Sequence, residues 1–533
     1  RIAVAVLDTT VRKAPARVAF EDTLAAGSVE EGATQLHADT QGNLWLALKR
    51  RYARAAFRPS VHWESFLTRL EGDRWSEPVP LPASWTRRSI RMGLASSGGR
   101  LWAFWPHESR RWEFASRPLE NRVMAGSMPL PGPAVAPKLT EYRPENVSVA
   151  AAHPREREEV AVARQYRVKL GDQVLRVLRG DLHRHTELSQ DQGGQDDGTI
   201  VEFYRYMIDA ADMDFGASTD HQAGGIDYWN AMALKLAEMY YFPQRFTPLY
   251  GYERNLGNPH GHRNVIHTQR DYPIVPFFQG IDRRFMLPDT PDGELLTFNS
   301  NSFGGGVAND TKLLYDELRK SGGLAISHTS STAGMGTDWR DNDPQLEPVV
   351  EIYQGARQNA EHKNAPRGVR DGEENKALGG FLAPGLVWNA WKKGYRLGVI
   401  ASSDHYSTHI SYAMVYAPGP SREEIFDAIK KRRTYGATDN ILLEFWMGDR
   451  FMGDDFRAAE RQKIRIKAIG TGEIAKVRLI RDGNFIYEAS PGKQEVSLEY
   501  VDREADAGEH WYYVRIEQAN GELAWSSPIW VTY

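Results

Sequence analysis

The sequence predicts an α/β protein with a TIM-like barrel in its central part, flanked by a β-rich segment and a β-sandwich. Three observations lead to this prediction. Short apolar strands alternate with helical stretches between residues 165 and 440, a pattern typical of parallel sheets. That stretch, about 275 residues long, has the size of a barrel of this class. Both flanking segments instead show strand patterns separated by Gly-containing turns.

The composition is that of an ordinary globular protein. With 533 residues, the chain is longer than one hydrophobic core usually supports, so several domains are expected. Lys and Arg number 66 against 70 for Asp and Glu, so the net charge is −4 and no basic field indicates nucleic acid. No apolar run approaches the roughly 18 residues of a membrane span. We therefore expect a small-molecule substrate, with the oligomeric state left open.

The sequence contains no cysteine, which excludes disulfides, iron–sulfur clusters and Cys-ligated zinc. Any metal must therefore be bound by His, Asp and Glu. The 15 histidines are unevenly distributed, since 10 of them lie between His183 and His409. A chain without Cys that starts at Arg1 is expected to be periplasmic or secreted, with a cytoplasmic location as the alternative.

Residues 1–128 are expected to form a β-rich domain. Gly42-Asn43-Leu44-Trp45 recurs as Gly99-Arg100-Leu101-Trp102, and each stretch begins a strand-like alternation. A Gly turn before a Trp-bearing strand resembles a β-propeller blade of the sialidase type. Because the segment could supply only about two or three blades, a partial propeller and an open β-sheet domain remain alternatives. The Pro-rich passage Pro129–Pro137 then opens a linker predicted over residues 129–164.

Within residues 165–440, hydrophobic periodicity and Gly stops predict three helices, each followed by a strand. The predicted pairs are a helix that begins after Thr199 with the strand Phe215–Ser218, the helix Lys312–Lys320 with the strand Leu324–Ser327, and the helix Trp388–Lys393 with the strand Leu397–Ala401.

Residue types that bind metals follow the strands of this segment. His183 and His185 come directly after an apolar run, and the period of two in a strand points both imidazoles to the same side. Catalytic residues of barrels gather at the C-terminal ends of the strands, so these strand ends together predict a multinuclear metal site. The other strand ends carry Asp220 and His221, Glu253 with His260 and His262 beyond it, His328, Glu351, and Asp404 with His405.

Residues 441–533 are expected to form a small β-sandwich. The pattern after Asn440 is entirely β, and Asp482-Gly483 and Asn520-Gly521 are typical hairpin turns. About 90 residues with regular turns suit a sandwich. Just before this segment, Ser421-Arg422-Glu423-Glu424 has the pattern of a capping box and predicts the start of a helix.

The strand-end motifs resemble those of the PHP (polymerase and histidinol phosphatase) superfamily. The matching stretches are Asp181–Thr186, Thr219–His221, Gly251–Glu253, Ile326–His328 and Ser403–His405. In addition, Arg432–Thr438 and Ala524–Trp530 look like the DUF3604 branch of that superfamily. The resemblance implies a distorted (βα)7 barrel that binds two or three divalent ions, which would be Zn²⁺, Mn²⁺ or Fe²⁺.

The resemblance also implies which side chains bind the ions. The implied ligands are His183, His185, Glu253 and Asp404 for one ion, Glu253, His328 and His262 for a second, and His221, His405 and a loop carboxylate such as Asp191 for a third. His260 is the alternative to His262. Asp404 and His405 are adjacent, unlike the usual spacing, so His409 competes with His405 for this position, and two ions are better supported than three.

This ligand set implies hydrolytic chemistry. A carboxylate that bridges two ions about 3.5–4 Å apart holds a water whose pKa falls toward roughly 7, and the hydroxide attacks phosphorus in line. Asp220 would act as a general acid or orient His221. Arg263, Arg340 or Arg357 would clamp a phosphate, each with a structural role as the alternative. The sequence thus predicts a metal-dependent phosphoesterase; the alternatives are an amidohydrolase-type enzyme acting on amides or lactones, and a non-enzymatic metal-binding scaffold.

Overall fold

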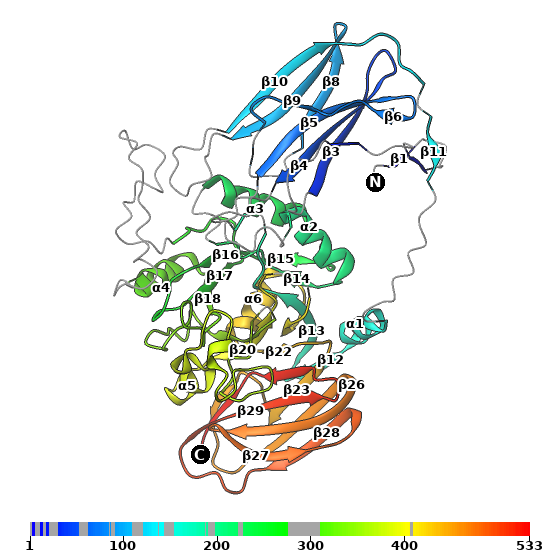
Figure 1. Ribbon diagram of the computed structural model, residues 1–533. Helices are drawn as coiled ribbons and strands as arrows, with labels where there is room; N and C mark the ends of the chain where they lie inside the picture. The colour runs from blue at the N-terminus through cyan, green and yellow to red at the C-terminus, as the bar shows by residue number, and fades with distance from the viewer. Residues whose placement is uncertain are drawn as a thin grey trace. The chain divides into compact units, whose positions relative to one another are not determined.

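The computed structural model of the chain divides into two compact units (Figure 1). The first comprises residues 1–152 with 281–298, and the second comprises residues 153–280 with 299–533. The structure describes residues 3–5, 11–13, 18–20, 30–52, 62–84, 86, 91–108, 121–136, 138–142, 154–186, 188–189, 198–221, 227–275, 310–355, 357–405 and 409–533.

The described part of the first unit consists of antiparallel strands. Its strands are β1 (Ala3–Ala5), β2 (Val11–Lys13), β3 (Glu30–Ala38), β4 (Leu44–Tyr52), β5 (His62–Glu71), β6 (Arg74–Trp75), β7 (Val79–Pro80), β8 (Gly93–Ser97), β9 (Arg100–Glu108), β10 (Asn121–Pro129) and β11 (Thr140–Glu141). They form sheets with the orders β3-β4-β5-β6, β10-β9-β8 and β1-β2-β11, and β7 pairs with β5.

The two Gly-Trp repeats occupy equivalent turns but differ in how their tryptophans pack. Gly42 and Gly99 both adopt positive φ, as expected of the residue that turns the chain into a strand. Trp45 is buried, whereas Trp102 on β9 is 37% exposed and Trp105 fills the corresponding core. The partial-propeller assignment therefore stays a prediction.

The larger sheet of the second unit combines strands from both ends of that unit (Figure 1). Its members are β12 (Arg167–Leu170), β13 (Gln173–Asp181), β14 (Phe215–Gly216), β15 (Thr247–Pro248), β21 (Tyr412–Ala417), β22 (Thr434–Ala437), β23 (Leu442–Met447), β24 (Arg450–Phe451), β25 (Asp455–Arg457), β26 (Lys463–Arg481), β27 (Asn484–Ala489), β28 (Lys493–Val501), β29 (Glu509–Gln518), β30 (Leu523–Ser526) and β31 (Ile529–Thr532). The main path runs β15-β14-β13-β21-β22-β30-β29-β26-β23-β24.

The smaller sheet of this unit has the order β16-β17-β18-β19-β20. Isolated parallel bridges connect the two sheets at both sides, one between His221 and Glu253 and one between Arg184 and Asp404. The paired strand ends therefore carry residues of the predicted metal site. The bounds of these strands are β16 (Tyr250–Arg254), β17 (Arg263–His267), β18 (Leu324–Ser327), β19 (Val349–Gln354) and β20 (Gly398–Ser402).

The predicted pairs of helix and strand are confirmed within one to three residues. Thr199 caps its helix by accepting a hydrogen bond from the backbone N–H of Glu202. Gly322 follows the helix Asp310–Ser321 and Gly394 follows the helix Val387–Lys392, both with positive φ. Ser421 makes the expected capping box with Glu424. The helices are α1 (Glu156–Gln165), α2 (Ile200–Arg205) with a π-helical continuation (Tyr206–Ala210), α3 (Asp227–Met239), α4 (Asp310–Ser321), α5 (Val387–Lys392) and α6 (Arg422–Lys430), with 3-10 turns at Glu374–Lys376 and Ala383–Gly385.

The alternation of strand and helix is incomplete in the smaller sheet. β16, β17 and β18 pair antiparallel, whereas β18, β19 and β20 pair parallel. An antiparallel neighbour needs no crossover helix, and β16 and β17 are joined without one, whereas α4 (Asp310–Ser321) lies between β17 and β18. The distorted (βα)7 barrel accordingly stays a prediction.

Strands of the predicted sandwich continue the sheet of the predicted barrel. Tyr435 to Ala437 of β22 pair with Ala524 to Ser526 of β30, and β22 also pairs with β21. The predicted linker, residues 129–164, contains β11 and α1, and the division between the two units falls at Ala152. Residues 153–533 other than 281–298 therefore behave as one compact unit, and the separate sandwich domain stays a prediction.

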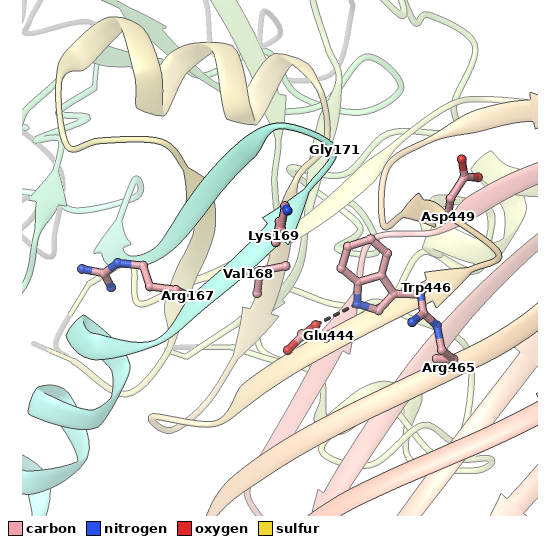
Figure 2. Close-up of a pocket in the computed structure, with 8 residues that line it drawn as sticks. All are labelled: Arg167, Val168, Lys169, Gly171, Glu444, Trp446, Asp449 and Arg465. Atoms are coloured by element: carbon pink, nitrogen blue, oxygen red, sulfur yellow. Dashed lines mark hydrogen bonds between the residues drawn. The ribbon is translucent and has the colours of Figure 1, made fainter.

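An open pocket of about 370 Å³ lies where β12 approaches β23 and β26 (Figure 2). The indole N–H of Trp446 donates to Glu444 across 2.8 Å, and the guanidinium of Arg465 lies 5.3 Å from the indole ring. Tyr166 also donates to Glu444. None of the predicted metal ligands lines this pocket, so it is separate from the strand ends described above.

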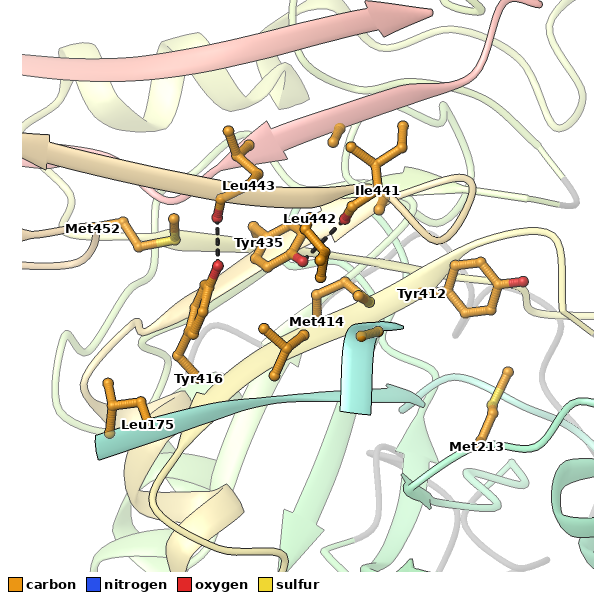
Figure 3. Close-up of a cluster of buried hydrophobic side chains, with 14 of the residues drawn as sticks. Leu175, Met213, Tyr412, Met414, Tyr416, Tyr435, Ile441, Leu442, Leu443 and Met452 are labelled. Atoms are coloured by element: carbon orange, nitrogen blue, oxygen red, sulfur yellow. Dashed lines mark hydrogen bonds between the residues drawn. The ribbon is translucent and has the colours of Figure 1, made fainter. Parts of the chain in front are cut away.

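Buried side chains fill the space between β13, β21 and β22 on one side and the C-terminal strands on the other (Figure 3). Two of the tyrosine hydroxyls in this core donate hydrogen bonds to backbone carbonyls next to or within β23. Tyr416 donates to the carbonyl of Leu443 at 2.8 Å, and Tyr435 donates to the carbonyl of Ile441 at 3.0 Å. A buried hydroxyl without a partner would cost stability, so these bonds help to fix how β21 and β22 lie against β23.

A buried ion pair joins the loop after β19 to β29. Both Glu361 oxygens lie 2.9 Å from Nη1 of Arg515, and both side chains are almost fully buried. Trp525 donates to the same carboxylate at 2.9 Å, and Tyr513 donates to it as well. The charge is therefore paired and hydrogen-bonded, as burial requires.

No helix among the described residues is long and apolar enough to cross a membrane.

The Arg515→Met variant is expected to lose about 3–5 kcal/mol of unfolding free energy, because the Glu361 carboxylate would stay buried without its charge partner. Urea denaturation followed by circular dichroism measures this loss. The double variant Glu361→Leu/Arg515→Met, which removes both charges, should regain part of it. A single variant as stable as the native chain would contradict the prediction.

The same pair predicts a pH dependence of stability. Burial raises the pKa of Glu361, but the Arg515 guanidinium and the hydrogen bonds to the carboxylate outweigh burial, and the pKa lies below its usual value. The contribution of Glu361 is then complete above about pH 4.3 and is lost as the pH falls through the folded-state pKa. The difference in unfolding free energy between the native chain and Glu361→Gln should therefore shrink on acidification. A difference that stays constant between neutral and acidic pH would refute this.

Candidate metal centre

The carboxylate of Glu253, at the end of β16, is surrounded by five imidazoles. Its two oxygens face different histidines. Oε1 lies 2.7 Å from Nδ1 of His262 and 3.4 Å from Nε2 of His328. Oε2 faces the Nε2 atoms of His185 at 3.1 Å, His183 at 3.4 Å and His221 at 3.9 Å.

Asp404, directly after β20, provides a second carboxylate to the same cluster. Its Oδ1 lies 3.1 Å from Nε2 of His185, 3.4 Å from Nε2 of His183 and 3.5 Å from Nε2 of His405. The residue has φ of +64°, a conformation that Asp tolerates better than most residues. Its amide donates to the carbonyl of His183, and Arg184 donates to its carbonyl at 2.7 Å. These bonds hold the carboxylate in the cluster.

All eight metal ligands predicted from the sequence lie in groups whose ligand atoms are within 4.8 Å of one another. Glu351 of β19 joins them. The groups are His183 with His185 and Asp404, Glu253 with His262 and His328, His185 with His221 and His405, and His183 with His328 and Glu351.

The arrangement of the clustered His, Asp and Glu side chains suits the binding of divalent ions better than hydrogen bonding among these side chains. Asp404 Oδ1 and His328 Nε2 are buried without a hydrogen-bond partner, although imidazole or carboxylate atoms lie close to both. The Nε2 atoms of His183 and His185 face each other at 3.2 Å. Lone pairs and carboxylate oxygens that converge without hydrogen-bond geometry are the arrangement of metal ligands.

The outer ring nitrogens of three histidines are occupied by neighbouring side chains. Nδ1 of His183 lies 3.0 Å from Oε2 of Glu351, Nδ1 of His185 lies 2.6 Å from Oγ of Ser189, and Nδ1 of His328 lies 3.0 Å from Oγ1 of Thr329. Each contact leaves Nε2 directed at the cluster. Outer partners of this kind set the tautomer and ring orientation of metal-binding histidines.

Electrostatics keep the carboxylates of Glu253 and Asp404 ionised, whereas burial raises the pKa of Glu351. Burial raises the pKa of Glu253, but the surrounding imidazoles outweigh burial and hold it well below its usual value. Burial lowers the pKa of His183, yet the carboxylates of Asp404 and Glu351 raise it well above its usual value. For His328, burial and the charge of His183 lower the pKa to about 3. Ionised carboxylates and a neutral imidazole are the forms that bind metal ions.

The structure distinguishes the rival histidines that the sequence left open. His260 turns away to Asp341, whose Oδ2 lies 2.6 Å from its Nδ1. His409 contacts the hydroxyl of Tyr206 at 2.6 Å and the carboxylate of Glu156 at 3.1 Å. Among the described residues, the ligand groups contain His262 and His405 and neither of these two. Asp191 lies outside the described residues.

Asp220, one of the predicted catalytic residues, is hydrogen-bonded to Thr186. It accepts hydrogen bonds from the backbone N–H of Thr186, at 2.6 Å, and from the Thr186 hydroxyl. It therefore ties the chain after His185 to the strand end that carries His221. Its proposed action as a general acid stays a prediction.

The three arginines considered for phosphate binding lie in different surroundings. Arg263 is buried and donates to Glu347 and to the carbonyls of His260 and Gly261. This arrangement favours its structural alternative. Arg340 is a surface residue paired with Asp338. Arg357 has its Nε 3.6 Å from Oδ2 of Asp404 and is the arginine that reaches the cluster.

Sequence reasoning assigned no separate role to three supporting residues. Asp181, the last residue of β13, accepts hydrogen bonds from the amides of His183 and Ser403 and so connects the first and last motifs. Glu351, which the sequence placed after an apolar pair, lies within β19. Gln354, which donates to Asp404, carried no signal, because its direction depends on an irregularity in β19.

Comparisons with known proteins identify distant relatives. No family model matches the chain. An uncharacterized protein of Chlamydia muridarum is 26% identical over 254 residues, which cover 41% of this chain and 40% of the relative. An uncharacterized protein of Chlamydia pneumoniae is 23% identical over 373 residues, covering 61% and 53% respectively. The chain thus spans about half or less of the length of the curated relatives it matches.

A solved structure to which the chain has a low similarity is a two-domain protein from Bacteroides vulgatus containing a predicted PHP-like metal-dependent phosphoesterase. Its sequence identity to this chain is 13% and the TM-score is 0.31, with 69% of this chain and 99% of that chain covered.

The placement of the two rival histidines after β16 predicts different effects of their removal. Zn²⁺ added to chelator-treated protein should raise the melting temperature, since a ligand at 100 times its Kd stabilises the native state by about 2.7 kcal/mol. His262→Ala should lose the part of this rise that the ion bound by His262 and His328 contributes. The matched control His260→Ala should keep it, although the loss of its contact with Asp341 lowers the melting temperature without metal. Equal rises in both variants would show that the ligand assignment is wrong.

Proposed function

We propose that this protein is a divalent-metal-dependent hydrolase that cleaves a phosphate ester. The observation that carries the proposal is the placement of Glu253. One of its oxygens faces His262 and His328, and the other faces His183 and His185. A carboxylate whose two oxygens face separate sets of imidazoles suits a bridge between two divalent ions.

In this proposal, His183, His185 and Asp404 hold one ion together with Glu253, and His262 and His328 hold the second with the same carboxylate. His221 and His405 are available for a third ion. Divalent ions in such a site supply Lewis acidity and lower the pKa of a water.

The chain's own residues would contribute positioning and charge. Arg357 presents a partly exposed guanidinium beside Asp404, and its fork of N–H groups suits the oxygens of a phosphate. Asp220 holds Thr186, and with it the segment after His185, against the strand end that carries His221. Apart from the 21% exposed His221, the imidazoles around Glu253 are nearly buried, so a substrate would meet a site with little bulk water.

We also propose that the two sheets of the second unit close into the distorted (βα)7 barrel. The ring would run through β13, β14, the β15–β16 segment, β17, β18, β19 and β20. The two isolated bridges, His221 with Glu253 and Arg184 with Asp404, support closure at the positions where the sheets are otherwise unpaired. A closed ring explains how ligands from both sheets meet at one end.

Metal analysis of the purified protein, combined with a panel of phosphomonoesters and phosphodiesters, tests the proposal. We expect bound divalent metal and turnover of at least one phosphoester class. Glu253→Gln should lose activity by 10²-fold or more, on the order of the effect of removing one group that stabilises the transition state. Arg340→Ala, at the surface, serves as the control and should retain native activity.

Other outcomes would redirect the assignment. Metal-free protein, or activity unchanged in Glu253→Gln, would overturn the proposal. Hydrolysis of amides or lactones without phosphoester turnover would favour the amidohydrolase alternative, and tight metal retention without turnover would favour the scaffold.

A further inference from the structure

A β-bulge lies in β19 next to the ligand groups. The register of β19 against β20 shifts between Glu351 and Tyr353. In a regular strand, Glu351 and Gln354 would point to opposite faces because they are three residues apart. The bulge brings both side chains to the cluster, since Glu351 contacts His183 and Gln354 contacts Asp404.

Glu351 occupies the outer nitrogen of His183. Its Oε2 lies 3.0 Å from Nδ1 of His183, and both side chains are almost fully buried. An ionised Glu351 only accepts, so the one ring proton that His183 would keep on binding a metal ion is held on Nδ1. Nε2, which faces Glu253, Asp404 and His185, is thereby left with its lone pair.

Gln354 donates a hydrogen bond to one of the two carboxylate oxygens of Asp404. Its Nε2 donates to Oδ2 at 2.6 Å, and Nε of Arg357 lies 3.6 Å from the same oxygen. Oδ1 is left facing His183, His185 and His405 without a hydrogen-bond partner. One oxygen of Asp404 is therefore held by amide and guanidinium donors, and only the other is directed at the imidazoles.

We propose that Glu351 and Gln354 are positioning residues for the metal centre. Glu351 sets the tautomer and orientation of His183, and Gln354 restricts Asp404 to binding through Oδ1 alone. The inference rests on the proposed metal-dependent function. It adds to that function two residues that act through His183 and Asp404.

Packing alone does not explain Gln354. Its side chain is buried, and its Oε1 has no hydrogen-bond partner. A buried amide with an unsatisfied oxygen costs stability, and an apolar side chain of similar length would avoid that cost. The contacts that Gln354 makes in return are the short bond from its Nε2 to Oδ2 of Asp404 and a 3.5 Å contact of the same nitrogen with Nδ1 of His183.

Metal binding to Gln354→Met tests the proposal, because this variant keeps the length of the side chain and removes the donor. The matched control is Gln358→Met, whose native amide donates to the Ser331 hydroxyl at 3.2 Å. Chelator-treated full-length proteins are titrated with Zn²⁺ by calorimetry and with Co²⁺ by visible absorption. Gln354→Met and Glu351→Gln should each raise the Kd for Zn²⁺ by 10–100-fold, as loss of an outer partner does. Gln358→Met should stay within about twofold of native.

The Co²⁺ spectrum separates positioning from a general loss of structure. With Oδ2 released, Asp404 can bind through both oxygens, and a higher coordination number weakens the visible bands of Co²⁺. Gln354→Met should therefore show weaker bands at saturating Co²⁺, while Gln358→Met should show the native spectrum. Melting of the metal-free proteins checks that each variant is folded. If Gln354→Met does not fold, Gln354→Asn replaces it, since its amide is one methylene too short to reach Oδ2.

The outcomes distinguish this inference from the proposed function. If the native protein binds neither Zn²⁺ nor Co²⁺, the proposed metal-dependent function is overturned, and so are the positioning roles of Glu351 and Gln354. If native protein binds metal and the folded Gln354 and Glu351 variants match it in Kd and spectrum, only the positioning roles are overturned.

Discussion

Glu253 carries a carboxylate that is removed from water and surrounded by imidazole rings, and the second unit is arranged so that this charge is tolerated. An isolated buried carboxylate would cost several kcal/mol or take up a proton. Imidazoles from five different positions in the chain prevent this by approaching both of its oxygens. Each of those imidazoles must in turn be held in its orientation by other side chains. Burying the Glu253 carboxylate therefore constrains residues near the ends of most of the surrounding strands.

The supporting contacts come from parts of the chain that lie far apart in sequence. Asp181 joins the backbone of the first motif to that of the last, and Arg184 holds the carbonyl of Asp404. Farther out, the buried pair of Glu361 and Arg515 fastens the loop after β19 to the C-terminal strands. Because β22 pairs with both β21 and β30, the C-terminal strands belong to the framework that carries the ligands.

How far sequence reasoning reached can be judged from particular residues. His183 and His185 were recognisable because a strand repeats every two residues, and the helix after Ser421 because its capping box is local. The sequence favoured His262 and kept His260 as the alternative, since both follow the same strand. Only the path of the loop turns one toward Glu253 and the other toward Asp341. The role of Gln354 could not be predicted for a similar reason. A bulge changes the direction in which a side chain points, and the neighbouring residues in the sequence do not indicate it.

The sequence by itself determined the types of ligand and the strand ends at which they stand, because spacing within a strand and the absence of cysteine are local or compositional properties. Tertiary structure alone decided which histidines converge, which oxygen of Asp404 faces them, and that the C-terminal strands join the central sheet. Most of these relations join segments that lie far apart along the chain. They depend on strand pairing and on the burial of charge, and neither can be evaluated until the chain has folded.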